Sequence, residues 1–291
     1  PLPRPLTVVV DAGNGCGGLG VPVLEALGAH VIPLFCEPDP SFPNHHPDPT
    51  VEANLQHLIA AVAEHEADLG VAFDGDVDRI GVVDENGLVI WGDMLTLLFA
   101  REVLKTHPGA AIIGEVKCSK TLYDGISEAG GTPIMWKAGH SLIKAKMKST
   151  GAPLAGEMSG HLFFADRYYG YDDAIYAAGR LLALIAAGAQ PLSDLLSGLP
   201  VTHSTPEIRR DCGTEARKFA LVKQAEDYFS ARYPCSLIDG VRIDFEDGWG
   251  LVRASNTQPI LVLRFEAHTA ARLGQIRSLV EDQLTRLEEV L

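Results

Sequence analysis

Hydrophobic and polar positions follow two rhythms in the first third of the chain. Short β-branched or apolar runs, typical of buried strands, occur at TVVV (7–10), VIPLF (31–35) and LGVAF (69–73). Between them, a helix is predicted over 21–27, and a second apolar set has helical spacing. That set lies on one helical face: Leu55, Leu58, Ile59 and Val62. Pro49 or Thr50 suits its first turn.

A hairpin is predicted at IGVVDENGLVI, residues 80–90. The turn residues Glu85-Asn86-Gly87 divide this stretch into two apolar halves.

The middle third repeats the alternation of strand and helix. Strands are predicted over 110–116, 132–136 and 152–157, and helices over 93–106, 119–129 and 140–149. Strand–helix alternation favours parallel pairing with helices on the sheet faces.

The last third has a different order of elements. A helix is predicted over 215–230, followed by strands in VRIDF, GLVRAS and ILVLRFEA and a final helix over 269–290. That last helix carries one apolar face: Leu273, Ile276, Val280, Leu284 and Leu287. Strands grouped between two helices indicate a smaller α+β domain.

These patterns predict an α/β protein with two consecutive α/β domains, whose mixed sheets are largely parallel, followed by a smaller α+β C-terminal domain. We place the boundaries near Leu88 and Pro200, which gives domains 1–88, 89–200 and 201–291.

Composition narrows the possible partners. The 291 residues carry a formal net charge of −14, which argues against nucleic acid or an anionic membrane surface as a partner. The five cysteines include no CxxC pair, which favours free thiols in a reducing compartment, so we expect a cytoplasmic protein. The longest apolar run, 181–189, is too short to span a bilayer, and no signal peptide opens the chain.

The acidic loop AFDGDVDR places Asp74, Asp76 and Asp78 directly after a buried strand. An EF-hand is excluded because its sixth position needs glycine and is Arg79 here. An aspartate-nucleophile phosphatase also has D-x-D after a strand, but Thr or Val usually stands where this chain has Asp78. Three alternating carboxylates suit Mg²⁺, because oxygen ligands are its preference and a cation offsets their repulsion.

Four further loops carry candidate binding residues. In GEMSGH (156–161), Glu157 and Ser159 can bind two sugar hydroxyls. Lys117 and His140 each follow a predicted strand, where α/β sheets bind ligands. The loop RASNTQP offers a cluster of donors suited to a phosphate monoester: Arg253, Ser255, Asn256 and Thr257.

The glycine loop DAGNGCGG (11–18) fits the G-x-G-x-x-G spacing from Gly13, and Glu37 follows at a suitable distance. A dinucleotide site therefore stays open as an alternative, although a structural loop is the favoured interpretation.

Six motifs in series, DAGNGCGG, FPNHHPDP, DGDVDR, KAGHSLIK, GEMSGH and RASNTQP, resemble the α-D-phosphohexomutases. The resemblance extends from about residue 6 to near the C-terminus. GEMSGH is the form typical of the bacterial enzymes that act on mannose and glucose phosphates.

The resemblance implies interconversion of hexose 1-phosphates and 6-phosphates, including those of mannose and glucose, through a bisphosphate intermediate. It implies that Asp74, Asp76 and Asp78 hold Mg²⁺ and that Arg79 lies near the transferring phosphoryl group. Glu157 and Ser159 would bind the sugar. The implied ligands of the phosphate that is not transferred are Arg253, Ser255, Asn256 and Thr257. The resemblance also implies three further contacts in the active site, Lys117, His140 and His161. Either His161 or Lys117 would assist proton transfer.

Two features depart from the family pattern. Val77 stands where Gly or Ala is frequent, and a β-branched residue is disfavoured at φ > 0. The nucleophile motif T-A-S-H-N-P, which carries the family's phosphoserine, occurs nowhere in the 291 residues. The chain is therefore expected to correspond to domains two to four, without the N-terminal domain, and to be inactive alone.

Two other functions remain as alternatives to the mutase. One is a non-catalytic module that binds sugar phosphates, and the other is an aspartate-nucleophile phosphatase that uses Asp74.

Overall fold

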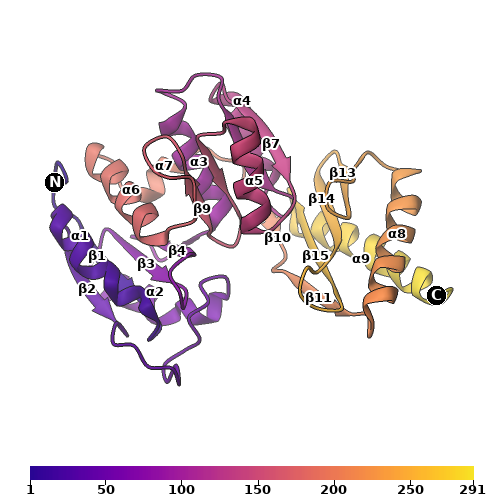
Figure 1. Ribbon diagram of the computed structural model, residues 1–291, viewed down its shortest axis with the longest axis horizontal. Coiled ribbons are helices and arrows are strands. Elements are labelled where there is room, and N and C mark those ends of the chain that lie inside the picture. The colour runs from indigo at the N-terminus through magenta and orange to yellow at the C-terminus, as the bar shows by residue number, and fades with distance from the viewer. The chain divides into compact units, whose positions relative to one another are not determined.

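A computed structural model describes residues 1–291, which divide into two compact units. The first unit comprises residues 1–134 and 139–198, and the second comprises residues 135–138 and 199–291. The predicted fold class is confirmed: two α/β layers are followed by an antiparallel α+β unit (Figure 1).

The first sheet of unit 1 has the strand order β2-β1-β3-β4-β5. Its strands are β1 (Thr7–Asp11), β2 (His30–Leu34), β3 (Leu69–Phe73), β4 (Ile80–Asp84) and β5 (Val89–Ile90). β2, β1 and β3 run parallel, whereas β3, β4 and β5 pair antiparallel. The hairpin prediction holds, because Gly87 adopts the left-handed φ of 83° that its turn requires.

Helices cover both faces of this sheet. They are α1 (Val21–Leu27), α2 (Gln56–Glu64) and α6 (Ala174–Ala187). The α2 residues Leu58 and Val62 pack against Val9 and Val83 on one face. On the other face, Phe73 lies beside Gly20, which precedes α1, and Ile175 in α6 lies beside the same glycine.

Two sequence expectations in this region need correction. The helix expected to begin near Pro49 begins at Gln56, after a 3-10 turn η2 (Glu52–Leu55). Thr50 instead bonds to Asp48 through its N–H and hydroxyl. The apolar run over 181–189 belongs mostly to α6, which was not predicted as an element and which covers the first sheet.

The second sheet of unit 1 has the order β7-β6-β8-β9. Its strands are β6 (Ala111–Glu115), β7 (Thr132–Trp136), β8 (Leu154–Gly156) and β9 (Leu162–Phe164). The helices α3 (Gly92–Val103) and α4 (Lys120–Glu128) cover one face, and α5 (His140–Thr150) covers the other (Figure 1). The short helix α7 (Leu192–Leu195) follows α6.

Unit 2 is an antiparallel sheet with two helices on one face. Its strands are β10 (His203–Ser204), β11 (Ile208–Asp211), β12 (Cys235–Ser236), β13 (Val241–Phe245), β14 (Gly248–Ala254) and β15 (Ile260–Ala267). The helices α8 (Glu215–Ser230) and α9 (Ala270–Glu288) bury apolar side chains against β13, β14 and β15. The predicted face of α9 is confirmed, with Ile276, Val280 and Leu284 fully buried.

We expect Arg180 to be a main stabilising residue of unit 1. Its guanidinium bonds to Asp166 and Glu102 and lies 4.6 Å from the Phe164 ring centre. Arg180→Met leaves the buried Asp166 carboxylate without this cation, which costs about 3–5 kcal/mol of unfolding free energy. Urea unfolding monitored by circular dichroism measures the loss.

Lys223→Met is the matched control, because Lys223 pairs only with the exposed Asp227 on α8. It should leave the urea midpoint unchanged. Equal effects of the two substitutions would contradict the role of Arg180.

Candidate functional site

The acidic loop begins where β3 ends. Asp74 directly follows β3 and is buried, with 1% of its surface exposed. The ligand oxygens of Asp74, Asp76 and Asp78 all lie within 4.8 Å of one another. Carboxylate oxygens gathered on one short loop suit a hard divalent cation.

Val77 adopts φ = 70° at the tip of this loop. A left-handed backbone is unfavourable for a β-branched residue, so the surrounding contacts must maintain it. One such contact is the Val77 carbonyl, which accepts the N–H of Ala174 at the start of α6. The departure from Gly or Ala is therefore accommodated in a strained conformation.

Arg79 lies among three carboxylates. Its Nε donates to Asp74 Oδ2 at 2.8 Å and lies 3.8 Å from Asp78 Oδ1, while Nη1 bonds Asp48 Oδ1 at 3.1 Å. Asp74 Oδ1 accepts the backbone N–H groups of Asp78 and Arg79. Because both Asp74 oxygens are engaged, the arrangement suits a fixed ligand better than a free nucleophile.

The acidic loop contains carboxyl groups with opposite pKa shifts. Burial raises the pKa of Asp74 to about 6, because the hydrogen bonds from Arg79 only partly offset the loss of water. The hydrogen bond from His161 lowers the pKa of Asp78 to about 2. A bound cation would relieve the cost of ionising Asp74.

A short backbone bridge joins the acidic loop to GEMSGH. Arg79 and His161 form an antiparallel β-bridge, and the Ile80 N–H donates to the Gly160 carbonyl at 3.1 Å. Gly160 has φ = 98°, and a Cβ there would lie 2.2 Å from the Ile80 oxygen. Only glycine allows this approach, so the motif's second glycine is required by the contact.

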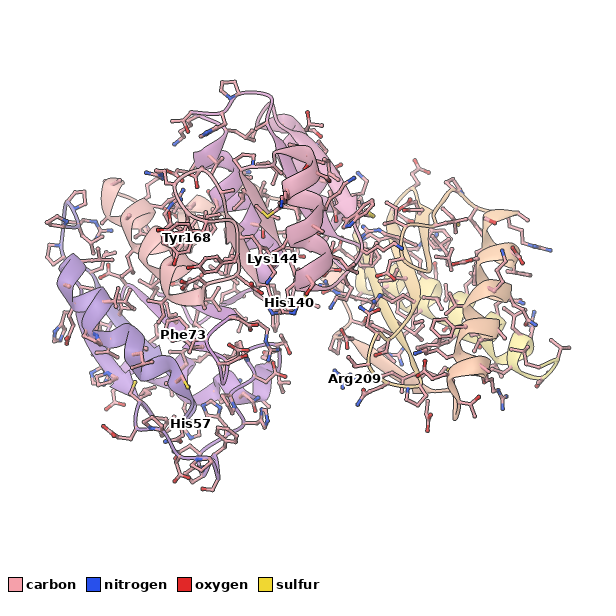
Figure 2. The ribbon with its side chains drawn as sticks, in the orientation of Figure 1. His57, Phe73, His140, Lys144, Tyr168 and Arg209 are labelled. Carbon is pink, nitrogen blue, oxygen red and sulfur yellow. The ribbon has the colours of Figure 1, made fainter.

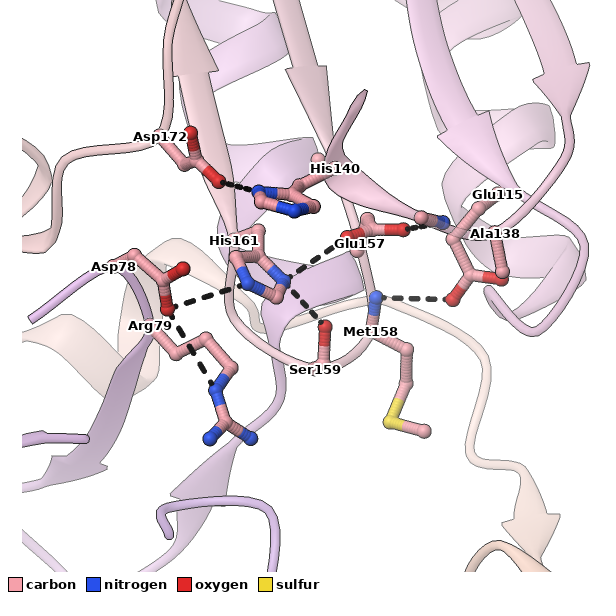
Figure 3. A network of polar contacts seen from close by, with 12 residues as sticks. Asp78, Arg79, Glu115, Ala138, His140, Glu157, Met158, Ser159, His161 and Asp172 are labelled. Carbon is pink, nitrogen blue, oxygen red and sulfur yellow. Dashed lines mark hydrogen bonds and ion pairs between the residues drawn. The ribbon is translucent and has the colours of Figure 1, made fainter. Parts of the chain in front are cut away.

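His161 lies at the centre of the polar network drawn in Figure 3. Its Nε2 is 3.3 Å from Asp78 Oδ1, and its Nδ1 is 3.0 Å from both Glu157 Oε2 and Ser159 Oγ. Burial alone would lower the pKa of His161, but the hydrogen bonds to Asp78 and Glu157 raise it to about 9. His161 is therefore an imidazolium at neutral pH.

Glu157 is a buried carboxylate held by two donors. Its Oε1 accepts the Gly139 N–H at 2.6 Å, and its Oε2 pairs with His161. These contacts keep the pKa of Glu157 below its ordinary value, although burial opposes them. Ser159, two residues on, shares His161 with Glu157.

His140 and Lys144 extend the network along α5 (Figure 2). His140 Nδ1 lies 2.9 Å from Asp172 Oδ2, and Lys144 Nζ donates to the other oxygen of Asp172 at 2.8 Å. The His140 ring stacks on the His161 ring at a centroid distance of 5.7 Å. The structure thus brings His140, Glu157, Ser159 and His161 together with the acidic loop.

Lys117 lies at the end of β6, beside the fully buried Glu115. Its Nζ is 4.0 Å from Glu115 Oε1, and its N–H donates to Glu115 Oε2 at 2.6 Å. Glu115 Oε1 also accepts the Met158 N–H at 3.3 Å, which links the Lys117 turn to GEMSGH (Figure 3).

The loop RASNTQP lies in unit 2, between β14 and β15. Arg253 Nε donates to Asp239 Oδ2 at 2.8 Å, and its Nη2 donates to Asn256 Oδ1 at 3.3 Å. The Thr257 N–H donates to Ser255 Oγ. Asn256 and Thr257 are exposed, so their polar groups can meet a ligand.

Sequence reasoning missed several charged partners: Asp48, Glu115, Asp172, Lys218 and Asp239. Asp48 lies in FPNHHPDP and Glu115 lies in EVKCSK, so both were inside motifs already noted. Nothing local distinguishes Asp172, Lys218 or Asp239 from ordinary surface charges, because their partners are distant in the chain.

The glycine loop packs closely against other loops. The Asp11 carboxylate accepts the Gly13 N–H and contacts His45 Nε2 at 3.0 Å. A Cβ on Gly13 would lie 2.9 Å from Pro47, and one on Gly15 would lie 2.9 Å from Gly75. These contacts account for two of the glycines by packing alone.

None of the helices is long and apolar enough to cross a bilayer.

Comparisons with known proteins agree along the whole chain. Models of phosphoglucomutase/phosphomannomutase domains match in series: alpha/beta/alpha domain II over residues 2–87, alpha/beta/alpha domain III over 91–202 and the C-terminal domain over 207–283.

Individual relatives are similar over nearly all of the chain. A Pseudomonas putida phosphomannomutase/phosphoglucomutase is 51% identical over 294 residues, which cover 100% of this chain and 63% of that protein. A Neisseria gonorrhoeae phosphoglucomutase is 48% identical, covering 95% of this chain and 61% of the relative. A crystal structure of a phosphoglucomutase/phosphomannomutase family protein from Burkholderia thailandensis superposes with a TM-score of 0.91 at 46% identity, covering 99% of this chain and 62% of that one. The chain thus spans less than two thirds of the length of these relatives.

We expect the His161 imidazole to titrate near pH 9 in EDTA-treated protein, as measured by ¹H–¹³C NMR of the histidine rings. Asp78→Asn should lower that pKa by about 1–3 units, because it removes an opposite charge. Asp124→Asn is the control, since Asp124 pairs only with Lys120 on α4.

The raised pKa of His161 makes the free energy of unfolding depend on pH. Because folding raises the pKa of His161, its contribution to unfolding free energy is complete below its ordinary pKa of 6.5 and is lost as pH rises through about 9. A His161 pKa unmoved by Asp78→Asn would contradict the ion pair.

Proposed function

Because the chain belongs to the phosphoglucomutase/phosphomannomutase family, we propose that it supplies the metal, sugar and phosphate loops of a hexose-phosphate mutase. The whole enzyme interconverts the 1- and 6-phosphates of glucose and mannose through a bisphosphate. The observation that carries this proposal is the Arg79–His161 bridge, which sets the acidic loop against GEMSGH.

The four charged residues of the acidic loop have defined roles in this mechanism. Asp74, Asp76 and Asp78 would hold the divalent cation on which the family depends, and we propose that this cation is Mg²⁺. A cation held there would supply positive charge that offsets the charge of the transferred phosphoryl group. Arg79 turns its guanidinium toward the same phosphoryl group and lowers the energy of the developing charge.

The remaining residues bind and orient the sugar phosphate. Glu157 accepts a hydrogen bond from one sugar hydroxyl, and Ser159 donates a hydrogen bond to a second one. His140 lies beside them. His161, held as an imidazolium, and Lys117 are the two candidates for moving a proton. The phosphate that is not transferred is held in unit 2 by the loop residues Arg253, Ser255, Asn256 and Thr257.

The phosphoryl donor of the mutase is a phosphoserine, and none of the serines of this chain lies in the T-A-S-H-N-P motif. We therefore propose that the donor is on a segment outside these 291 residues.

The three domains are assigned as 1–88, 89–200 and 201–291. The five free cysteines are consistent with a cytoplasmic location.

Mg²⁺ binding should depend on pH through Asp74. We expect calorimetry at pH 7.5 to give a dissociation constant weaker than micromolar, because Mg²⁺ retains several waters on a three-carboxylate loop. Below the Asp74 pKa of about 6, the affinity should fall about 10-fold per pH unit, since protons compete for that carboxylate.

Asp76→Asn should weaken Mg²⁺ binding, whereas Asp227→Asn, an exposed change on α8, should leave it unchanged. An Asp76→Asn protein that binds Mg²⁺ with wild-type affinity would show that the acidic loop is not the metal site.

The chain should bind glucose 1-phosphate more tightly than free glucose. Arg253→Met should weaken glucose 1-phosphate binding about 10- to 100-fold, because a hydrogen bond to a charged group contributes about 1.5–3 kcal/mol. Calorimetric titration measures both ligands.

Arg209→Met is the matched control, since Arg209 is an exposed residue of β11 (Figure 2) that pairs with Glu207, the residue before that strand. In a coupled assay, the chain alone should show no interconversion of the two phosphates. Turnover by the chain alone would refute the proposed external donor.

A further inference from the structure

Lys218 is a buried cation that the proposed mechanism does not use. It lies in the first turn of α8, and only 1% of its surface is exposed. Lysine is almost never fully buried unless its ammonium is paired, because removing the charge from water is costly. The groups that bond to the Lys218 ammonium therefore indicate its role.

Two of those partners are backbone carbonyls of the phosphate loop. Lys218 Nζ donates to the Ser255 oxygen at 2.8 Å and to the Gln258 oxygen at 2.9 Å. The third partner is Glu215 Oε2 at 2.7 Å, on a side chain that is 58% exposed. The ammonium thus bridges two carbonyl groups of the loop, and Asn256 and Thr257 lie between these two residues in the chain.

This closure sets the direction of a backbone donor. In a trans peptide unit the C=O and the following N–H point in opposite directions. Because the Ser255 carbonyl points toward Lys218, the Asn256 N–H points away from it, toward the exposed side of the loop. The Asn256 side chain is held separately by Arg253 and by the Ala138 carbonyl.

We propose that Lys218 is a positioning residue for phosphate binding, which orients the Asn256 N–H and places a positive charge behind the loop. This inference rests on the proposed function of RASNTQP. Glu215 compensates part of the ammonium charge, so the orientation of the Asn256 N–H is the main contribution that we assign to Lys218.

Lys218→Met keeps the length of the side chain and removes the ammonium. Calorimetry with glucose 1-phosphate should show binding weakened about 10-fold or more, because the loop loses its closure and a charge. Mg²⁺ affinity should be unchanged, since the acidic loop belongs to the other unit.

Lys223→Met, five positions along the same helix, is the control and should stay within about 2-fold of wild type. A purely structural role would lower the melting temperature of Lys218→Met but leave glucose 1-phosphate affinity at wild-type level in the folded protein. That result would overturn the proposal.

A measurement on the wild-type chain covers the case in which Lys218→Met fails to fold. The ¹⁵Nζ resonance of Lys218, assigned by NOEs to its side chain, should shift on addition of glucose 1-phosphate but not of free glucose. An unmoved resonance at saturation would overturn the role of Lys218 while leaving the proposed function intact. If the wild-type chain bound no glucose 1-phosphate at all, both proposals would fail.

Discussion

The close approach of Gly160 to the backbone of Ile80 is the constraint on which the site in unit 1 depends. A hydrogen bond and a single β-bridge join two loops that are about 80 residues apart in the chain. They leave no space for a Cβ at Gly160. Once this contact forms, Asp78 and His161 come within hydrogen-bonding distance, which joins the acidic loop to GEMSGH.

Charge compensation follows from this geometry. The carboxylates of Asp48, Asp74 and Asp78 surround the Arg79 guanidinium, and His161 is shared between Asp78 and Glu157. These few cations make the packing of so many carboxylates tolerable, yet Asp74 still has a raised pKa because its burial is not fully offset. A divalent cation would complete the balance. The same chain carries a net charge of −14, so any anionic ligand must be held by local donors.

Buried charges beneath loops recur across the molecule. Asp11 holds the glycine loop to His45, Glu115 joins the Lys117 turn to Met158, and Lys218 bonds to backbone carbonyls of RASNTQP. In each case a buried ionisable side chain bonds to groups of a loop that is distant from it or adjacent to it in the chain. Such contacts restrict the loop conformations, and restricting a loop before a ligand arrives reduces the entropy lost on binding.

Sequence alone determined the strand–helix order from β1 to β8, the apolar face of α9, the hairpin at Gly87 and the loops that carry the polar residues, because these depend on local periodicity and turn chemistry. Local pattern could not identify strands such as β10 and β12, whose two residues are stabilised only by pairing with distant partners. Nor could it place α6 on the first sheet or start α2 at Gln56. Only the tertiary structure decided which loops meet and which charges pair, since Asp172, Lys218 and Asp239 gain meaning from partners far away in the chain. Electrostatic and steric interactions act through space, and the sequence order carries little information about those distances.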